Sequence, residues 1–223
     1  MCLNLKQNVH FCAMYWQTLQ QLLLKNKNLY IAYTFLLCLA ATLQLQIGQY
    51  SLSLAINGIH NQYLDYFFTY ITHVGDGLFA IPIIVFVVWL NKKEALKAIA
   101  VLYGPALITQ VLKRLIFSDS FRPIRHLKDF NQLHWIPGLE IHELNSFPSG
   151  HSTSAFALAF LLALMLPNKK WGFLFLIPAL AVALSRVYLL QHFFEDVFAG
   201  AIIGGVAATL IYAIFETQRA KQH

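Results

Sequence analysis

The sequence predicts an all-α polytopic membrane protein, and its composition and the arrangement of its apolar residues carry this prediction. Of the 223 residues, 58% are hydrophobic and only 12% are charged, which is too apolar for a soluble domain of this size. The apolar residues form runs that approach the roughly 20 residues a helix needs to cross a hydrocarbon core of about 30 Å. Helices are expected because lipid offers no partners for unpaired backbone groups.

Six apolar runs are predicted to form a bundle of six transmembrane helices. They cover about residues 29–47, 71–90, 95–117, 149–166, 171–190 and 193–215. The second run is long enough only if its core at 78–90 extends back through Ile71, Thr72 and Val74. A polar stretch at about 118–147 separates the third and fourth runs and is expected to be an outer loop.

The predicted membrane domain is a single unit covering residues 28–217. Residues 1–27 mix leucines and Trp16 with polar residues, which predicts either a helix lying along the membrane interface or a weakly ordered tail. The run at 29–47 is longer than the apolar region of a signal peptide and is taken as the first span. Residues 218–223 are expected to be a short cytoplasmic tail.

The distribution of positive charge predicts the orientation. An even number of spans puts both termini on one side, and that side collects ten Lys and Arg residues against six on the other. The positive-inside rule then places the termini in the cytoplasm. Trp89 and Trp171 fall at the cytoplasmic ends of their spans, where aromatic residues are common. A bacterial inner (plasma) membrane is the expected location.

Cysteine usage and net charge exclude several classes of protein. Cys2, Cys12 and Cys38 show neither a disulfide framework nor a zinc spacing. The net charge of +6 is spread over short loops, so nucleic acid is not an expected partner. Basic residues also lie near helix ends on the outer side, where topology disfavours them, and these are candidates for binding an anion. The sequence does not indicate an oligomeric state.

Three polar clusters interrupt the apolar sequence, and the predicted topology brings them together at the outer face. Charged groups at membrane helices are costly and usually mark a functional site. The clusters are Lys113-Arg114 with Arg122-Pro123, then Pro148-Ser149-Gly150-His151, and then Ser185-Arg186 with His192 and Asp196.

The residue types in these clusters suit a phosphoryl group. Arg122 and Arg186 offer planar forks that bind two oxygens at once, and Lys113 adds a compact charge. Ser149 and Gly150 open a helix, where unpaired N–H groups and the positive end of the dipole favour an anion.

The same clusters contain a nucleophile and an acid/base. His192 and Asp196 are four residues apart, so on one helix face the carboxylate can hold one ring nitrogen and leave the other to attack phosphorus. His151 can protonate the leaving oxygen and then activate water. No further carboxylate cluster suggests a pair of metal ions, so neither a metal nor a cofactor is expected.

These motifs resemble those of the type 2 phosphatidic acid phosphatase (PAP2) family. The second motif, Pro148-Ser149-Gly150-His151, and the third, Ser185-Arg186 with His192 and Asp196, match its pattern throughout. The first departs in spacing, because Lys113 and Arg122 have eight residues between them where the family usually has six, and Arg114 is an alternative to Lys113. The resemblance covers roughly residues 60 to 215.

The resemblance implies a six-helix bundle and metal-independent hydrolysis through a phosphohistidine on His192. The expected substrate is a phosphate monoester or diphosphate on a lipid: phosphatidic acid, phosphatidylglycerol phosphate, a polyprenyl diphosphate or a phosphorylated lipid A. Two alternatives remain open, a vanadium haloperoxidase-like enzyme and a non-catalytic lipid-binding protein. The role of His73 and Asp76 is also left open. They either support the site or lie at a helix start that water reaches at the membrane interface.

Overall fold

The computed structural model describes residues 2–128, 130, 133–140 and 142–221, and every regular element in these ranges is a helix. The α-helices are α1 Cys2–Lys25, α2 Lys27–Ile47, α3 Gln49–Gly58, α4 Gln62–Ile71, α5 Ala80–Leu90, α6 Ala95–Leu115, α7 Pro123–Leu127, α8 Gly150–Met165, α9 Leu176–Tyr188 and α10 Phe194–Ala220. Short 3-10 segments are η1 Thr72–Gly75, η2 Gly77–Phe79, η3 Lys92–Glu94 and η4 Lys169–Phe175. The predicted all-α class is confirmed for the described residues.

Four stretches of the described chain are long and apolar enough to cross a membrane. They are Lys27–Ile47, Lys92–Leu115, Lys169–Tyr188 and Phe194–Ala220, and the bent pair Gln62–Gly75 with Gly77–Leu90 adds a fifth if it counts as one span. Helix α8 has 16 residues and rises only about 24 Å, less than the hydrocarbon thickness of about 30 Å. The helices therefore support four or five spans, and the predicted count of six is not established.

The second predicted span differs most from its prediction. We expected one continuous helix from Ile71 to Leu90, but the chain bends by 65° between η1 and η2. Asp76 lies at the bend in an extended conformation, with φ −71° and ψ 138°. A charged residue between Gly75 and Gly77 disfavours a continued helix, so the helix is broken at Asp76.

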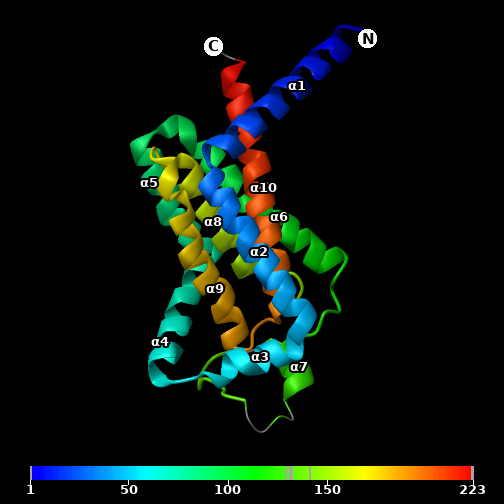
Figure 1. The fold of residues 1–223 in the computed structure, drawn as a ribbon, viewed down its shortest axis with the longest axis vertical. Helices are drawn as coiled ribbons and strands as arrows, with labels where there is room; N and C mark the ends of the chain where they lie inside the picture. The colour runs from blue at the N-terminus through cyan, green and yellow to red at the C-terminus, as the bar shows by residue number, and fades with distance from the viewer. Residues whose placement is uncertain (1, 129, 131–132, 141, 222–223) are drawn as a thin grey trace.

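The segments outside the apolar runs are also helical. Residues predicted as an interfacial helix or a weakly ordered tail form α1, which projects from the end of the bundle that carries the chain termini (Figure 1). Its second half lies against α10, where the Tyr15 hydroxyl donates to the Leu210 carbonyl at 3.4 Å. Helices α3, α4 and α7 were not predicted, because none of them carries an apolar run of spanning length.

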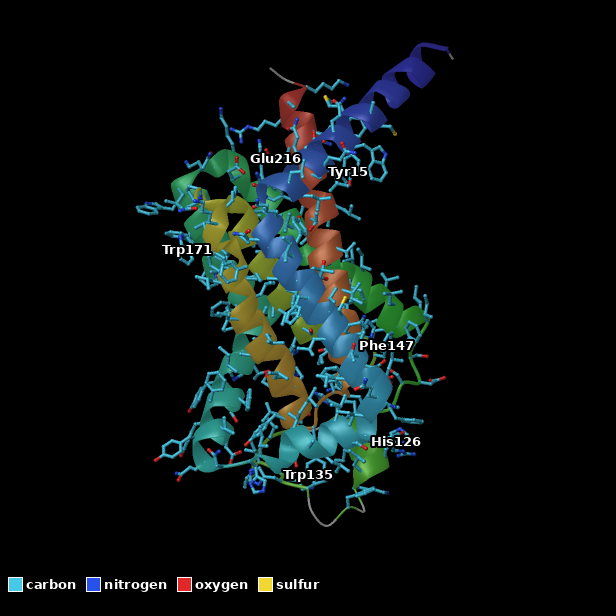
Figure 2. All side chains as sticks on the ribbon, viewed as in Figure 1. Tyr15, His126, Trp135, Phe147, Trp171 and Glu216 are labelled. Atoms are coloured by element: carbon cyan, nitrogen blue, oxygen red, sulfur yellow. The ribbon has the colours of Figure 1, made fainter. Side chains whose placement is uncertain are left out.

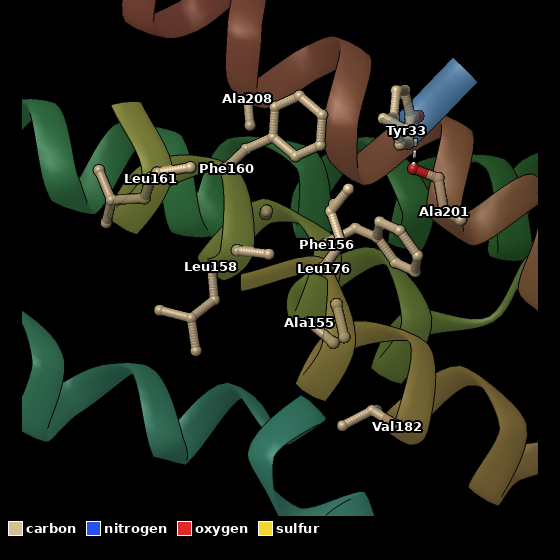
Figure 3. Packing of buried hydrophobic residues seen from close by; sticks show 14 of the residues in the cluster. Tyr33, Ala155, Phe156, Leu158, Phe160, Leu161, Leu176, Val182, Ala201 and Ala208 are labelled. Carbon is tan, nitrogen blue, oxygen red and sulfur yellow. Dashed lines mark hydrogen bonds between the residues drawn. The ribbon is translucent and has the colours of Figure 1, made fainter. Parts of the chain in front are cut away.

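Helix α8 forms the centre of the bundle. Helices α6, α9 and α10 pack around it, and residues on all sides of it, including Phe156, Phe160 and Leu161, are buried (Figure 3). An apolar helix without a polar face is expected in such a central position. Helix α2 closes one side, where the Tyr33 hydroxyl donates to the Ala201 carbonyl of α10 at 3.0 Å.

The two ends of the bundle differ in what they carry. Both termini lie at one end, and α3, α7 and the turn between α9 and α10 lie at the other (Figure 1). Side chains follow the same division, with Tyr15 and Glu216 near the termini and His126 and Trp135 at the opposite end (Figure 2). This arrangement brings the turn that contains His192 close to the polar loop after α6.

Candidate active site

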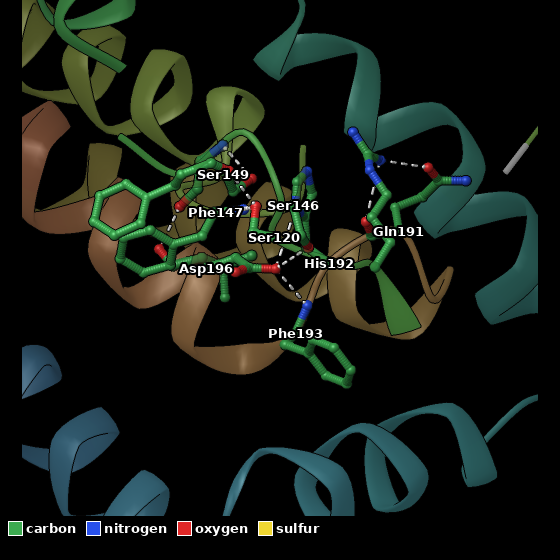
Figure 4. Close-up of polar contacts among 12 residues, drawn as sticks. Ser120, Ser146, Phe147, Ser149, Gln191, His192, Phe193 and Asp196 are labelled. Carbon is green, nitrogen blue, oxygen red and sulfur yellow. Dashed lines mark hydrogen bonds and ion pairs between the residues drawn. The ribbon is translucent and has the colours of Figure 1, made fainter. Parts of the chain in front are cut away.

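His192 and Asp196 form a buried pair at the start of α10. His192 Nδ1 lies 3.3 Å from Asp196 Oδ2, and each side chain is only 2% exposed. The same oxygen accepts hydrogen bonds from Ser146 Oγ at 2.5 Å and from the Phe193 N–H at 2.8 Å (Figure 4). Because Nδ1 faces the carboxylate, Nε2 is the ring nitrogen available to a substrate.

The turn between α9 and α10 produces this geometry. The N–H groups of Gln191 and His192 both donate to the Arg186 carbonyl, at 2.9 and 3.1 Å, and Leu190 adopts a left-handed conformation with φ 53°. His192 lies in the turn and Asp196 in the first turn of α10. The expected placement on one helix face is therefore wrong in detail, and the pair meets because Asp196 caps the helix start through the Phe193 N–H.

Three cationic side chains are buried in the same region. Arg122, Arg186 and Lys113 are 8%, 8% and 9% exposed. Arg122 donates from Nε to the Leu144 carbonyl at 3.0 Å and from Nη1 to both oxygens of Gln191 at 3.1 Å. Arg186 donates from Nη1 to Thr72 Oγ1 at 2.9 Å. Its buried Nε has no hydrogen-bond partner in the described part of the chain, so this donor suits an oxygen of a bound anion.

The structure separates Lys113 from Arg114. Lys113 is buried on α6, whereas the next residue, Arg114, is exposed. The charge of Lys113 acts on His192, together with those of Arg122 and Arg186. The buried lysine therefore belongs to the cluster in spite of its unusual spacing from Arg122.

The cluster also controls the protonation of His192. Burial lowers the pKa of His192 well below its ordinary value, and the positive charges of Arg122, Arg186 and Lys113 lower it further. The imidazole is thus uncharged at neutral pH, which is the form that can attack as a nucleophile.

Ser149 and Gly150 lie at the start of α8, next to the buried pair. Ser149 is the N-cap, its Oγ accepts from the Ser152 N–H at 3.4 Å, and its own N–H donates to the Asp196 carbonyl at 3.0 Å. The two helices meet this closely because a Cβ added at Gly200 of α10 would lie 2.5 Å from the Ser149 carbonyl oxygen. The first turn of α8 is thereby held against the first turn of α10.

His151 is the most accessible of the predicted site residues that form ion pairs. Its Nε2 lies 2.7 Å from Asp76 Oδ1, and the side chains are 28% and 38% exposed. Asp76 Oδ2 in turn lies 2.8 Å from His73 Nδ1. The open question about His73 and Asp76 is therefore answered in part, since Asp76 contacts a predicted site residue and His73 contacts Asp76.

Sequence reasoning missed three polar residues that contact the cluster. Ser146 bonds to Asp196, Gln191 to Arg122, and Thr72 to Arg186. Ser146 and Gln191 lie within two residues of the Pro148 and His192 motifs, and this proximity was the only signal that could have found them. Thr72 carried no signal, because a threonine at an apolar helix end is ordinary.

The arrangement can hold a phosphoryl group between a neutral histidine and buried cations, with a second histidine at the accessible side. All eight predicted site residues lie around the starts of α8 and α10, the end of α6, the start of α7 and the end of α9. Among the described residues, no three His, Cys, Asp or Glu side chains are grouped as metal ligands. Independence from metal stays a prediction.

Comparisons with known proteins identify the family of this chain. The sequence profile of the PAP2 superfamily matches residues 94–220. Phosphatidylglycerophosphatase B of Bacillus subtilis is 32% identical, over 77% of this chain and 87% of that protein. The bacitracin transport permease protein BcrC of Bacillus licheniformis is 34% identical over 47% of this chain, and the match spans about half of that relative, 49%.

A solved structure shares the fold. The crystal structure of a transmembrane PAP2 type phosphatidylglycerolphosphate phosphatase from Bacillus subtilis superposes with a TM-score of 0.59 at 28% identity, covering 89% of this chain and 96% of that one. The profile match covers more than half of the chain, and both motifs that fit throughout lie within it. This chain belongs to the PAP2 superfamily.

Proposed function

We propose that this chain hydrolyses a phosphate monoester or diphosphate on a membrane lipid, with His192 as the nucleophile. The supporting observation is the buried, uncharged imidazole of His192, which keeps Nε2 for the substrate and is acted on by three buried cations. Three buried cations repel one another unless an anion binds among them. A histidine with only a structural role would not require such a cluster.

The proposed reaction has two displacements. In the first, His192 Nε2 attacks phosphorus while the bond to the lipid oxygen breaks, and His151 gives that oxygen a proton. In the second, His151 takes a proton from water, the water oxygen attacks phosphorus, and the N–P bond breaks. Asp196 holds Nδ1 of His192 throughout, as the orienting carboxylate of a triad does.

The remaining predicted residues stabilise the charge on the phosphoryl oxygens. Arg122, Arg186 and Lys113 supply positive charge that is in place before the reaction begins. The first turn of α8, from Gly150, supplies N–H groups that have no acceptor within the helix. The Ser149 hydroxyl accepts from the Ser152 N–H and keeps its own proton for a phosphate oxygen.

A lipid is the proposed substrate because apolar helices surround the cluster. The spanning stretches Lys92–Leu115, Lys169–Tyr188 and Phe194–Ala220 all begin or end at site residues, so an acyl or prenyl chain can lie in the bilayer beside them. The name of the Bacillus subtilis relative, phosphatidylglycerophosphatase B, favours phosphatidylglycerophosphate among the candidates. The reaction is proposed to need no metal or other cofactor.

We propose the same membrane arrangement that the charges predict. The domain 28–217 then has six spans, with the bent pair as one span and α8 as another that neighbouring helices shield from lipid. The termini face the cytoplasm and the site faces the other side, in the inner membrane of a bacterium. The excess of Lys and Arg on the side of the termini supports this orientation.

The activity is tested by phosphate release from purified protein in detergent with chelator present. The panel contains phosphatidic acid, phosphatidylglycerol phosphate, a polyprenyl diphosphate and lipid A. We expect release from at least one lipid and none from His192→Ala. Equal turnover by this variant would contradict the mechanism, and loss with chelator would contradict metal independence. Vanadate-dependent halide oxidation would favour a haloperoxidase, and binding without release a non-catalytic carrier.

The orientation is tested separately by cysteine labelling in intact cells. After replacement of Cys2, Cys12 and Cys38 by serine, single cysteines are introduced as Ser118→Cys and Asn168→Cys. A reagent that cannot cross the membrane should label only the first. Labelling of the second alone would invert the orientation.

A further inference from the structure

The segment Thr72–Asp76 contacts two residues of the proposed site, although it belongs to none of the three motifs. Asp76 Oδ1 lies 2.7 Å from His151 Nε2, and Asp76 Oδ2 lies 2.8 Å from His73 Nδ1. At the other end of the segment, Thr72 Oγ1 accepts the hydrogen bond from Arg186 Nη1. Residues 72–76 also lie outside the profile match at 94–220, so neither motif nor family profile points to them.

Close packing sets the position of the Asp76 carboxylate. A Cβ added at the preceding residue, Gly75, would lie 2.8 Å from the His151 carbonyl oxygen and 2.8 Å from Val182 Cγ1. The backbone here therefore rests directly on α8 and α9. The Asp76 N–H also donates to the His73 carbonyl at 3.0 Å. The carboxylate thus reaches His151 from a backbone that the neighbouring helices hold in place.

We infer that Asp76 is a positioning residue that holds Nε2 of His151 and so directs Nδ1 to the oxygen of the leaving group. This inference rests on the proposed function. It makes the broken second span a part of the active site, and it gives each of the two histidines an orienting carboxylate.

The assignment accounts for every proton in the two steps. The proton on His151 Nε2 stays there throughout and is donated in a hydrogen bond to Asp76, which stays ionised. When the bond from phosphorus to the lipid oxygen breaks, the proton on Nδ1 passes to that oxygen and the ring becomes neutral. When water attacks, Nδ1 takes the water proton and the ring is charged again. Burial and the positive charges of Arg186 and Arg122 disfavour the charged form of the His151 ring, and the Asp76 carboxylate favours it.

The exposure of this pair separates a role in catalysis from a role in stability. Ion pairs that water reaches contribute about 0–1 kcal/mol to folding, and the His151 and Asp76 side chains are 28% and 38% exposed. The carboxylate can therefore be removed with little expected loss of folded protein.

The test compares Asp76→Asn with wild type on two substrates whose leaving groups differ. One is the phosphate monoester lipid that wild type cleaves fastest, whose alkoxide needs a proton to leave, and the other is p-nitrophenyl phosphate, whose nitrophenolate does not. We expect kcat/KM to fall about 10- to 100-fold for the lipid, since general acid catalysis contributes about 10²- to 10⁴-fold. For the aryl ester we expect a change below about threefold. Asp76→Glu should recover part of the lipid activity.

The matched control is Asp119→Asn, which removes one exposed carboxylate from the loop after α6 and should leave both substrates unaffected. An equal loss on both substrates would overturn the positioning role, as would an unchanged Asp76→Asn. If wild type cleaves neither substrate, the proposed function fails and Asp76 loses its role with it. Normal cleavage by wild type with no leaving-group dependence in the variant would overturn only the inference.

Discussion

Two histidine–carboxylate pairs stand at one end of the bundle and differ in burial and geometry. The buried pair is His192 with Asp196, each 2% exposed, and the outer pair is His151 with Asp76, at 28% and 38%. In the buried pair the carboxylate faces Nδ1, and in the outer pair it faces Nε2. The carboxylates therefore leave opposite ring nitrogens free, Nε2 in His192 and Nδ1 in His151.

Burial assigns different roles to two side chains of the same type. Burial and nearby cations keep His192 uncharged, as a nucleophile requires. His151 remains within reach of water, as the second displacement requires. The two histidines thus differ in their access to water and in the ring nitrogen that the carboxylate leaves free.

Replacing each histidine by alanine should produce the largest effects and separate the two pairs. We expect His192→Ala to lose more than about 10⁴-fold in turnover on both lipid and aryl phosphate, since the proposed bond from phosphorus to Nε2 cannot form. His151→Ala should still release one nitrophenolate per protein from p-nitrophenyl phosphate and then stall as a phosphoenzyme. Rapid-mixing absorbance measures this burst. A burst from His192→Ala would exchange the two roles.

Asp196→Asn should cost about 10³- to 10⁴-fold on both substrates, because an amide no longer holds the tautomer that presents Nε2. This equal loss is the opposite of the leaving-group dependence expected for Asp76→Asn. Steady-state kinetics on the two substrates measure it, with Asp119→Asn as the control. A loss confined to the lipid would show that the buried pair serves proton transfer to the leaving group. The two pairs would then have the same role, which contradicts the proposal.

Lys113→Gln should affect the buried pair through charge. A lost charge-assisted hydrogen bond of about 1.5–3 kcal/mol lowers kcat/KM about 10- to 100-fold. Because the Lys113 charge lowers the pKa of His192, its removal lets that pKa rise. The nucleophile is then protonated at higher pH, and the acidic limb of the kcat/KM profile moves up in pH. The control is Arg114→Gln, at the exposed neighbouring position, which should change neither kcat/KM nor the position of the acidic limb. An equal shift in this variant would contradict the place of Lys113 in the site.

Ser146→Ala should give the smallest effect. It removes the hydrogen bond from Ser146 Oγ to Asp196 Oδ2 and leaves the one from the Phe193 N–H. A net loss of about 1 kcal/mol corresponds to roughly a fivefold decrease in kcat/KM. The ratio of the rates on lipid and aryl ester should not change, because the outer pair is intact. A changed ratio would mean that the two pairs are coupled.

The sequence alone predicted the helical class, the positions of most long apolar helices and the two arginines of the cationic cluster. These follow from local physics. An apolar run of spanning length must form its backbone hydrogen bonds within itself, as a helix does. Charged residues beside such a run are costly and therefore indicate a functional site. The sequence also paired His192 with Asp196, since four residues of separation bring two side chains together at a helix start. Helices α3, α4 and α7 escaped it, because each has ten residues or fewer and so carries no run of spanning length. The break at Asp76 escaped it too, because apolar residues continue on both sides of it.

Packing between the helices was needed to show that Lys113, and not Arg114, is buried in the cluster, and that Asp76 contacts His151. Neighbouring residues on a helix face different directions, and which face is buried depends on helices distant in the sequence. Asp76 and His151 are 75 positions apart, and their contact exists because a backbone without a side chain at Gly75 packs directly onto α8. No spacing rule describes such a contact, because packing between helices and not helical periodicity creates it.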